Sequence, residues 1–163
     1  MTLENILNRI RSIANYQFGK SVGADLFPKG VEVTFSKATG RIRYVYLDGE
    51  RLATLRPTDG LFSLGITGAR RIAEERVSAK CFVTVRTDVA EFIAKGGDVF
   101  AAHVIRADDE IRSKEEVIIM DEKDAVLAVG QAVLSGEEMR AFKRGVAVKV
   151  RHGCLKKVKY NKH

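Results

Sequence analysis

The sequence predicts an α+β protein in which a small α+β domain precedes a small β-barrel. In the first half, apolar residues at helical spacing are followed by short alternating strands and glycine turns, which is typical of a helix packed on a small antiparallel sheet. From Arg76 to Gly153, short apolar strands alternate with two short helices and glycine turns, and no long helix is available for a parallel crossover. The predicted domains are therefore residues 1–75 and residues 76–153, followed by a basic tail at residues 154–163.

The composition of the 163 residues is that of a folded protein, and it excludes several classes. No apolar run is long enough to cross a membrane, and the N-terminus lacks the basic and apolar order of a signal peptide. We therefore expect a soluble, cytoplasmic protein with no membrane partner. Cys81 and Cys154 stand alone, without a C-x-x-C pair or a nearby histidine pair, so the sequence predicts no metal site, no disulfide framework and no cofactor.

The formal net charge of +7 is unevenly distributed along the chain. Residues 1–76 hold 12 Lys and Arg against 8 Asp and Glu, residues 77–153 hold 12 against 13, and residues 154–163 hold 4 against none. Lys and Arg that neutralise phosphates release condensed counterions, which makes nucleic acid a natural partner for a basic protein. Many soluble proteins are equally basic, however, so the charge alone does not identify the partner.

In the first half, apolar residues at helical spacing predict an amphipathic helix from Leu3 to Tyr16, after an N-cap at Thr2. Glycines and a proline predict an irregular segment at residues 19–30. Alternating and turn residues then predict strands at residues 31–36, 41–47, 51–55 and 61–64, and a helix at residues 68–76.

In the second half, alternating apolar residues predict a strand from Val77 to Val85, with Cys81 packed on its apolar face. Asp88, with Glu91 three residues later, predicts a capped helix that ends at Lys95. The remaining predicted elements are strands at residues 99–105, 117–120, 126–134 and 146–151, and a helix that begins with a capping box of Ser135 and Glu138 and ends before Gly145.

The second half contains several separated sequence blocks: Glu91-Phe-Ile-Ala-Lys-Gly-Gly97, Asp98-Val-Phe100, Leu127-Ala-Val-Gly130, Leu134-Ser-Gly-Glu-Glu-Met139 and Lys143-Arg-Gly-Val-Ala-Val148. Together they resemble a PUA domain, the small pseudo-barrel found in tRNA- and rRNA-modifying enzymes. They occur in the order of the family, which makes the match specific. One turn departs from the family, because Ser113-Lys-Glu115 stands where PUA domains usually have a Pro-Gly-Asp or Gly-Asp turn.

The first half is similar to the domain that precedes PUA in the archaeal tRNA-guanine transglycosylases and the related archaeosine synthases. The matching residues are Tyr16-Gln-Phe-Gly19, Thr39-Gly-Arg-Ile-Arg43, Leu52-Ala-Thr-Leu-Arg56, and Asp59-Gly60 with Gly68-Ala-Arg70. The catalytic part of the transglycosylases is a zinc-bearing TIM barrel of about 250 residues, for which this sequence has neither the room nor the clustered cysteines and histidine. The resemblance therefore implies a tRNA-binding portion without catalytic residues.

The resemblance also implies which residues touch RNA, because the PUA domain of that family grips the acceptor stem and 3′ end of tRNA. A lysine followed by two glycines would bring backbone N–H groups close to a phosphate, basic residues would neutralise the stem, and an aromatic ring would stack on an unpaired base. The candidate RNA-binding residues are Phe92, Lys95, Gly96, Gly97, Lys143, Arg144, Lys149, Arg151 and His152, with a secondary RNA patch of Arg41, Arg43, Arg70 and Arg71.

Each of these candidates also has a structural explanation. Gly96 and Gly97 fit a helix stop as well as a phosphate site. The spacing of Phe92 with Val89 and Ile93 favours a core position. The basic residues of the last strand, which the tail Lys156-Lys-Val-Lys-Tyr160 would extend, are equally compatible with an ordinary solvated face.

Three functions are consistent with these observations. The first is a non-catalytic tRNA-binding protein that acts with a separate tRNA-guanine transglycosylase or archaeosine-forming subunit. The second is a tRNA-modifying enzyme in its own right, although no carboxylate pair, Cys/His pair or metal cluster stands out. The third is a more general PUA protein that acts on rRNA or in translation, for which the transglycosylase-like first half would be unnecessary.

Overall fold

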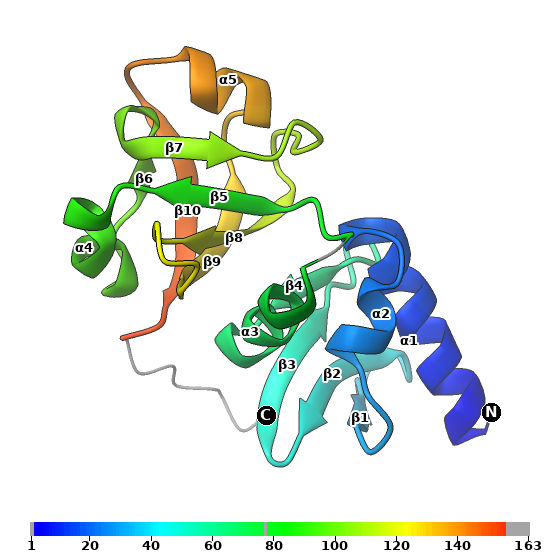
Figure 1. Cartoon of the computed structure of the whole chain (residues 1–163). Helices are drawn as coiled ribbons and strands as arrows, with labels where there is room; N and C mark the ends of the chain where they lie inside the picture. The colour runs from blue at the N-terminus through cyan, green and yellow to red at the C-terminus, as the bar shows by residue number, and fades with distance from the viewer. Residues whose placement is uncertain (1, 77, 156–163) are drawn as a thin grey trace. The chain divides into compact units, whose positions relative to one another are not determined.

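The computed structural model describes residues 2–76 and 78–155 of the chain, and it divides the chain into two compact units, Met1–Lys80 and Cys81–His163 (Figure 1). Each unit has its own sheet and its own helices. No helix in the described ranges has the length and apolar character needed to cross a bilayer. The α+β fold class predicted from the sequence is confirmed.

Unit 1, residues 2–80, packs helices against a four-stranded antiparallel sheet with the strand order β1-β2-β3-β4. Its elements are α1 (Leu3–Phe18), α2 (Val22–Leu26), β1 (Glu32–Phe35), β2 (Ile42–Leu47), β3 (Glu50–Leu55), β4 (Phe62–Leu64) and α3 (Ile66–Glu75). The first helix begins as predicted, because the Thr2 hydroxyl accepts a hydrogen bond from the Asn5 N–H at 3.1 Å.

The short helix α2 was not predicted, since the glycines around it suggested an irregular segment. The Asn15 side chain at the end of α1 accepts a hydrogen bond from the Gly23 N–H at 2.7 Å. A Cβ atom on Gly23 would lie 2.2 Å from the Arg11 carbonyl oxygen. Gly23 is therefore required by the close approach of α2 to α1, and not by a turn.

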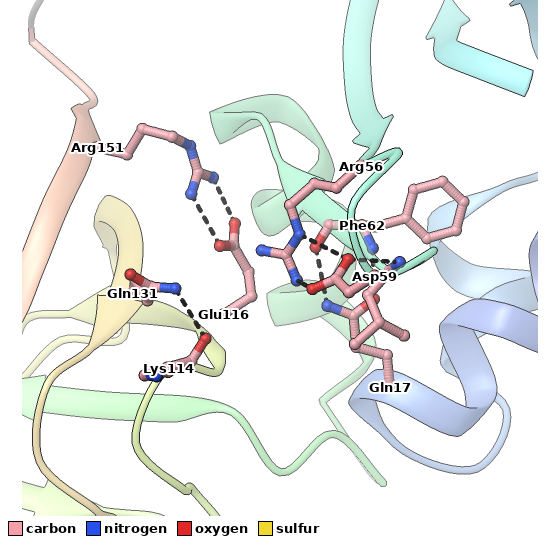
Figure 2. Close-up of polar contacts among 9 residues, drawn as sticks. Gln17, Arg56, Asp59, Phe62, Lys114, Glu116, Gln131 and Arg151 are labelled. Carbon is pink, nitrogen blue, oxygen red and sulfur yellow. Dashed lines mark hydrogen bonds and ion pairs between the residues drawn. The ribbon is translucent and has the colours of Figure 1, made fainter. Parts of the chain in front are cut away.

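The Tyr16-Gln-Phe-Gly19 segment joins α1 to the rest of unit 1. The Gln17 amide donates to the Phe62 carbonyl at 2.8 Å and accepts from the Phe62 N–H at 2.7 Å, which ties α1 to the start of β4 (Figure 2). Phe18 lies in the core, and a Cβ on Gly19 would lie 2.1 Å from the Ser78 carbonyl oxygen. Tyr16 alone of these four residues is free of the core, with 85% of its surface exposed.

Unit 2, residues 81–155, is built on a six-stranded, nearly closed sheet with the order β6-β10-β9-β8-β5-β7. Its elements are β5 (Phe82–Val85), η1 (Thr87–Val89), α4 (Ala90–Ala94), β6 (Val99–Phe100), η2 (Ala101–His103), β7 (Val104–Ala107), β8 (Glu116–Met120), β9 (Val126–Ala132), α5 (Gly136–Ala141) and β10 (Val146–Gly153). The strand predicted at residues 99–105 is two strands, because the 3₁₀ turn η2 carries the chain from one edge of the sheet to the other.

Two local predictions in unit 2 are wrong and one is confirmed. The strand predicted from Val77 begins only at Phe82, because the Lys80 N–H donates to the Phe18 carbonyl of unit 1 at 3.0 Å; Val77 itself lies outside the described residues. Asp88 makes no cap and instead bonds Arg86, while the Thr87 N–H donates to a Glu122 oxygen at 3.0 Å. The capping box of α5 forms as predicted between Ser135 and Glu138.

The core of unit 2 is aliphatic and is shared by the strands and both helices. Ile93 and Ala94 of α4 and Met139 of α5 are fully or almost fully buried, so both short helices contribute apolar side chains to this core. Cys81 is 4% exposed, which confirms the packed thiol that the sequence predicted.

Candidate nucleic-acid interface

The C-terminal end of α4 is a Schellman cap built on the two glycines. The Gly96 N–H donates to the Ile93 carbonyl and the Gly97 N–H donates to the Phe92 carbonyl, both at 2.9 Å. Gly96 has a φ of +106°, a conformation that side-chain-bearing residues rarely adopt. Both N–H groups therefore satisfy carbonyls of the helix. This favours the helix-stop explanation of the glycines over direct phosphate contacts by their N–H groups.

Phe92 lies on the surface beside this cap, not in the core that its spacing favoured. Its side chain is 56% exposed, whereas its neighbour Ile93 is fully buried. A Cβ atom on Gly97 would lie 2.3 Å from a carbon of the Phe92 ring. The ring thus rests against the backbone of Gly97, in space that any side chain at that position would occupy.

The C-terminal end of α4 and the residues that follow it, residues 92–98, are called the α4 corner. The end of β10 packs against this corner. The Val150 N–H donates to an Asp98 carboxylate oxygen at 2.9 Å, and the Leu155 N–H donates to the Ala94 carbonyl at 2.9 Å. A Cβ on Gly153 would lie 2.1 Å from that same carbonyl oxygen, so this glycine permits the approach. These contacts bring the second half of β10 beside the α4 corner. Of the predicted residues, Phe92, Lys95, Gly96 and Gly97 lie at the end of α4, and Lys149, Arg151 and His152 lie on β10.

Arg151 is engaged in an ion pair across the sheet. Its guanidinium donates from Nη1 to Oε1 of Glu116 at 2.8 Å and from Nη2 to Oε2, while the Glu116 side chain is fully buried (Figure 2). A buried carboxylate requires such a partner, because an isolated charge away from water is strongly unfavourable. Arg151 therefore stabilises β8 and β10 in this structure, and its positive charge is largely neutralised.

Lys95 and Lys149 differ in how freely they can reach a ligand. Lys95 forms an exposed ion pair with Glu91 at 2.8 Å, one helical turn earlier. The hydrogen bond and charge of Lys95 hold the pKa of the Glu91 carboxyl below its usual value. Exposed pairs of this kind are weak and exchange readily with other anions. Lys149 is exposed on β10, and no hydrogen bond or ion pair of its side chain occurs within the described residues.

Lys143 and Arg144 lie apart from this group, in the turn between α5 and β10. Both are exposed, and the neighbouring Gly145 carbonyl accepts a hydrogen bond from the Ala101 N–H at 2.9 Å. From this turn to Lys149 the strand rises about 3.3 Å per residue, a separation of roughly 15 Å. Lys143 and Arg144 are therefore separate from the exposed cation of β10.

The secondary patch predicted in unit 1 is divided by the structure. Arg41 and Arg43 line a groove of about 810 Å³, together with two arginines that the sequence analysis did not select, Arg9 and Arg56. The remaining pair is on α3 and does not line it: Arg70 is exposed, and the Nε of Arg71 donates to the Asp25 carbonyl at 3.0 Å. The repeated Arg and Gly residues of the two flanking turns, Ser36-Lys-Ala-Thr-Gly40-Arg41 and Arg56-Pro-Thr-Asp-Gly60, were the available indication of this grouping.

Within residues 2–76 and 78–155, no group of three or more His, Cys, Asp or Glu side chains is placed to hold a metal ion. The basic tail predicted at residues 154–163 lies, from residue 156 onward, outside the described residues.

Family models match both units of the chain. Residues 82–154 match the PUA domain, which agrees with the nearly closed sheet of unit 2. Residues 8–77 match the patch-forming domain C2 of tRNA-guanine transglycosylase. The fold therefore defines a PUA-class protein. More particularly, the chain combines a transglycosylase C2 domain with a PUA domain, as the sequence resemblance implied.

Relatives with high sequence identity are much longer than this chain. It is 46% identical over 156 residues to tRNA-guanine(15) transglycosylase of Pyrococcus furiosus, a match that covers 96% of this chain but 26% of the relative. The enzyme of Thermoplasma acidophilum is 42% identical over 148 residues, covering 90% of this chain and 23% of the relative. The chain thus corresponds to about a quarter of these enzymes, in their C-terminal part.

Solved structures share the complete two-unit fold. A hypothetical protein from Pyrococcus horikoshii superposes with a TM-score of 0.74 at 25% identity, covering 96% of this chain and 94% of that chain. A conserved PUA domain protein from Thermoplasma acidophilum superposes with a TM-score of 0.66 at 22% identity, covering 94% and 91%. The second likeness shows the fold alone, because its sequence identity is low.

Proposed function

We propose that the chain is a non-catalytic tRNA-binding protein. It would hold the tRNA substrate for a separate catalytic subunit that performs tRNA-guanine transglycosylation or archaeosine formation. The observation that carries this proposal is its 46% identity to one quarter of a tRNA-guanine(15) transglycosylase, over a C2 domain and a PUA domain. An archaeal cytoplasmic setting is part of the proposal, since the relatives described above are archaeal enzymes.

The α4 corner offers the contacts that an unpaired 3′ end needs. Phe92 presents an exposed ring on which a terminal base can stack, and Lys149 lies on the adjoining strand. Lys95 can exchange Glu91 for a phosphate, because their pair is fully solvated. The paired stem would be recognised by its shape and backbone, through cations such as Lys143 and Arg144. Gly96 and Gly97 would contribute indirectly, because they cap α4 and leave room for the Phe92 ring.

The first test is binding of the full chain to intact tRNA and to tRNA trimmed of its single-stranded 3′ tail, across a salt series. We expect trimming to weaken binding, and the logarithm of affinity to fall linearly with the logarithm of salt concentration, with each neutralised phosphate contributing about 0.7 to 0.9 to the slope. Affinity that does not change with salt would contradict the phosphate contacts. Equal binding of tRNA and unrelated structured RNA would instead support a general PUA protein.

The second test addresses the separate subunit. The chain, a transglycosylase catalytic subunit and tRNA are combined, and exchange of guanine is measured with each component left out in turn. We expect no exchange with the chain alone and faster exchange at low tRNA concentration when the chain is added to the catalytic subunit. Exchange by the chain alone would show that it is an enzyme in its own right.

A further inference from the structure

Unit 1 contains a groove with defined walls, unlike the exposed α4 corner of unit 2. Three segments form its walls: α1 contributes Arg9 and Ile13, the β1–β2 hairpin contributes residues 35–43, and the β3–β4 turn contributes residues 55–60. Its volume of about 810 Å³ is within the range of sites that enclose small organic groups. All of these segments belong to one compact unit.

The two turns beside the groove have the same backbone geometry. In the first, the Ser36 N–H donates to the Arg41 carbonyl and the Gly40 N–H donates to the Ser36 carbonyl, both at 2.8 Å. In the second, the corresponding bonds join Arg56 to Leu61 at 2.8 Å and Gly60 to Arg56 at 3.0 Å. Both glycines have a φ of +71°. The walls are therefore preorganised, which reduces the entropy lost when a ligand binds.

The charge of the groove is strongly positive. Four arginines line it, Arg9, Arg41, Arg43 and Arg56, against a single acidic residue, Asp59. Asp59 is bonded to Arg56, with Nε to Oδ1 at 3.1 Å and Nη2 to Oδ2 at 2.8 Å (Figure 2). In the described part of the chain, the side chains of Arg9 and Arg41 make no hydrogen bond or ion pair. An anion fits this charge, and phosphate suits the fork of a guanidinium.

The same groove has an apolar side, which a phosphate alone would leave unused. Ile13, Ile42 and Leu55 line it, and Phe35 contributes a ring that is 48% exposed. On α1, Tyr16 follows Ile13 by three residues, so its 85% exposed ring continues the face that carries Ile13 and Arg9. Exposed rings beside arginines are the combination that binds the bases and phosphates of an unpaired strand. In a duplex the base faces are stacked and not accessible to such rings.

We infer that this groove binds an unpaired nucleotide of an RNA strand, with its phosphate held by Arg41 and Arg9 and its base against Phe35. The inference rests on the proposed function, because it assigns unit 1 to the same RNA ligand. This site differs from the proposed PUA contact in place and in chemistry. Phe92 would stack on a terminal base, whereas the groove would bind a nucleotide within a strand that continues on both sides.

The test uses the full chain and a fluorescein-labelled single-stranded RNA of about ten nucleotides, a length comparable to known single-strand sites. A blunt-ended RNA duplex of the same length, which has no unpaired nucleotides, serves as the paired control. We expect Phe35→Ala to raise the Kd for the single strand about tenfold and to leave the Kd for the duplex unchanged. We expect Arg41→Ala to reduce the salt slope by about 1. Melting temperatures check that the variants fold, which the exposure of both side chains favours.

Lys29→Ala is the control, since Lys29 is an exposed cation of the same unit that does not line the groove. In addition, 4-thiouridine in the single strand should crosslink to residues 35–43 in the unchanged chain. Variants at Phe35 and Arg41 that bind the single strand as tightly as the unchanged chain would overturn the inference, even if tRNA binding that depends on Phe92 persists. Equally tight, Arg41-dependent binding of a polyglutamate peptide would also overturn it. If the chain binds tRNA no better than other structured RNA, but its binding to the single strand still depends on Phe35 and Arg41, only the proposed function is overturned.

Discussion

Phe92 occupies its exposed position because residue 97 has no side chain. The Gly97 backbone supports the ring, and the same glycine donates the hydrogen bond that completes the helix cap. These two roles can be separated, since the atoms nearest to a Cβ at residue 97 would belong to the Phe92 ring, a side chain that can rotate away. The position of the ring can therefore be altered while the backbone of the corner is kept.

The first residue-level prediction is that Gly97→Ala weakens tRNA binding with little change in melting temperature, because it displaces the Phe92 ring. Gly96→Ala is the contrasting variant. It forces a side chain into a φ of +106° and should lower the free energy of unfolding by roughly 1 kcal/mol or more. Binding by Gly97→Ala equal to that of the unchanged chain would show that the position of the ring does not matter.

The second residue-level prediction concerns the ring itself. Phe92→Ala should weaken binding to intact tRNA by about 1 to 3 kcal/mol and have no effect on tRNA without its 3′ tail, since stacking on a terminal base is the lost contact. Ile105→Ala, at a 41% exposed apolar residue on β7, is the control. An equal loss with trimmed tRNA would assign the ring to another part of the RNA.

For single residues, the sequence indicated several candidates but did not predict their exposure or their hydrogen-bond and ion-pair partners. Helical spacing assigned Phe92 to the core as an alternative, since spacing cannot show that Ile93 is buried while the preceding residue, Phe92, stays exposed. The motif with two glycines did not reveal that both N–H groups are consumed by the helix. Arg151 and Glu116 are 35 residues apart, so their ion pair depends on strand order that the local sequence does not encode.

Among the elements, β8 and β10 are linked by the Arg151–Glu116 pair. Arg151→Ala should destabilise unit 2 by about 3 kcal/mol, at the low end for a broken buried pair, because it leaves the buried Glu116 carboxylate without this cation. The double variant Arg151→Ala with Glu116→Gln should recover part of the loss. Denaturant unfolding of the four proteins measures the coupling, and additive losses would contradict it.

Elements were predictable where their determinants are local. The Thr2 cap, the hairpin of β1 and β2, and the Ser135 capping box all follow from neighbouring residues. Elements were missed where distant contacts decide them. Glu122 accepts from the Thr87 N–H in place of the predicted Asp88 cap, and contact with α1 rather than local pattern positions Gly23. The groove of unit 1 was only half predicted for the same reason.

For the whole molecule, three carboxyl groups make the stability depend on acidity. The Thr87 hydroxyl and N–H lower the pKa of Glu122, and Lys95 lowers that of Glu91. Partial burial would raise the pKa of Asp59, but its hydrogen bonds with Arg56 and Leu61 prevail and lower it. A carboxyl with a lowered folded-state pKa stabilises the fold above its ordinary pKa, and this stabilisation is lost as the pH falls through the folded value.

We therefore expect the melting temperature to fall as the pH drops below about 4, the range of ordinary carboxyl pKa values. The contributions are small, since all three groups are largely solvated. Glu122→Gln should reduce the acid-induced fall, whereas Glu74→Gln, at an exposed residue of α3, should leave it unchanged. An identical pH profile for Glu122→Gln would contradict the assigned role of Thr87.

The path of the chain through η2 also affects how the molecule behaves toward copies of itself. The two edge strands of the unit 2 sheet, β6 and β7, are joined by η2, so both edges are formed by one segment of nine residues. Neither edge strand is longer than four residues. Short edges of this kind offer a poor template for a foreign strand. The edges of the unit 1 sheet, β1 and β4, are equally short, with four and three residues. Neither of the two sheets therefore offers a long unpaired edge to another copy of the chain.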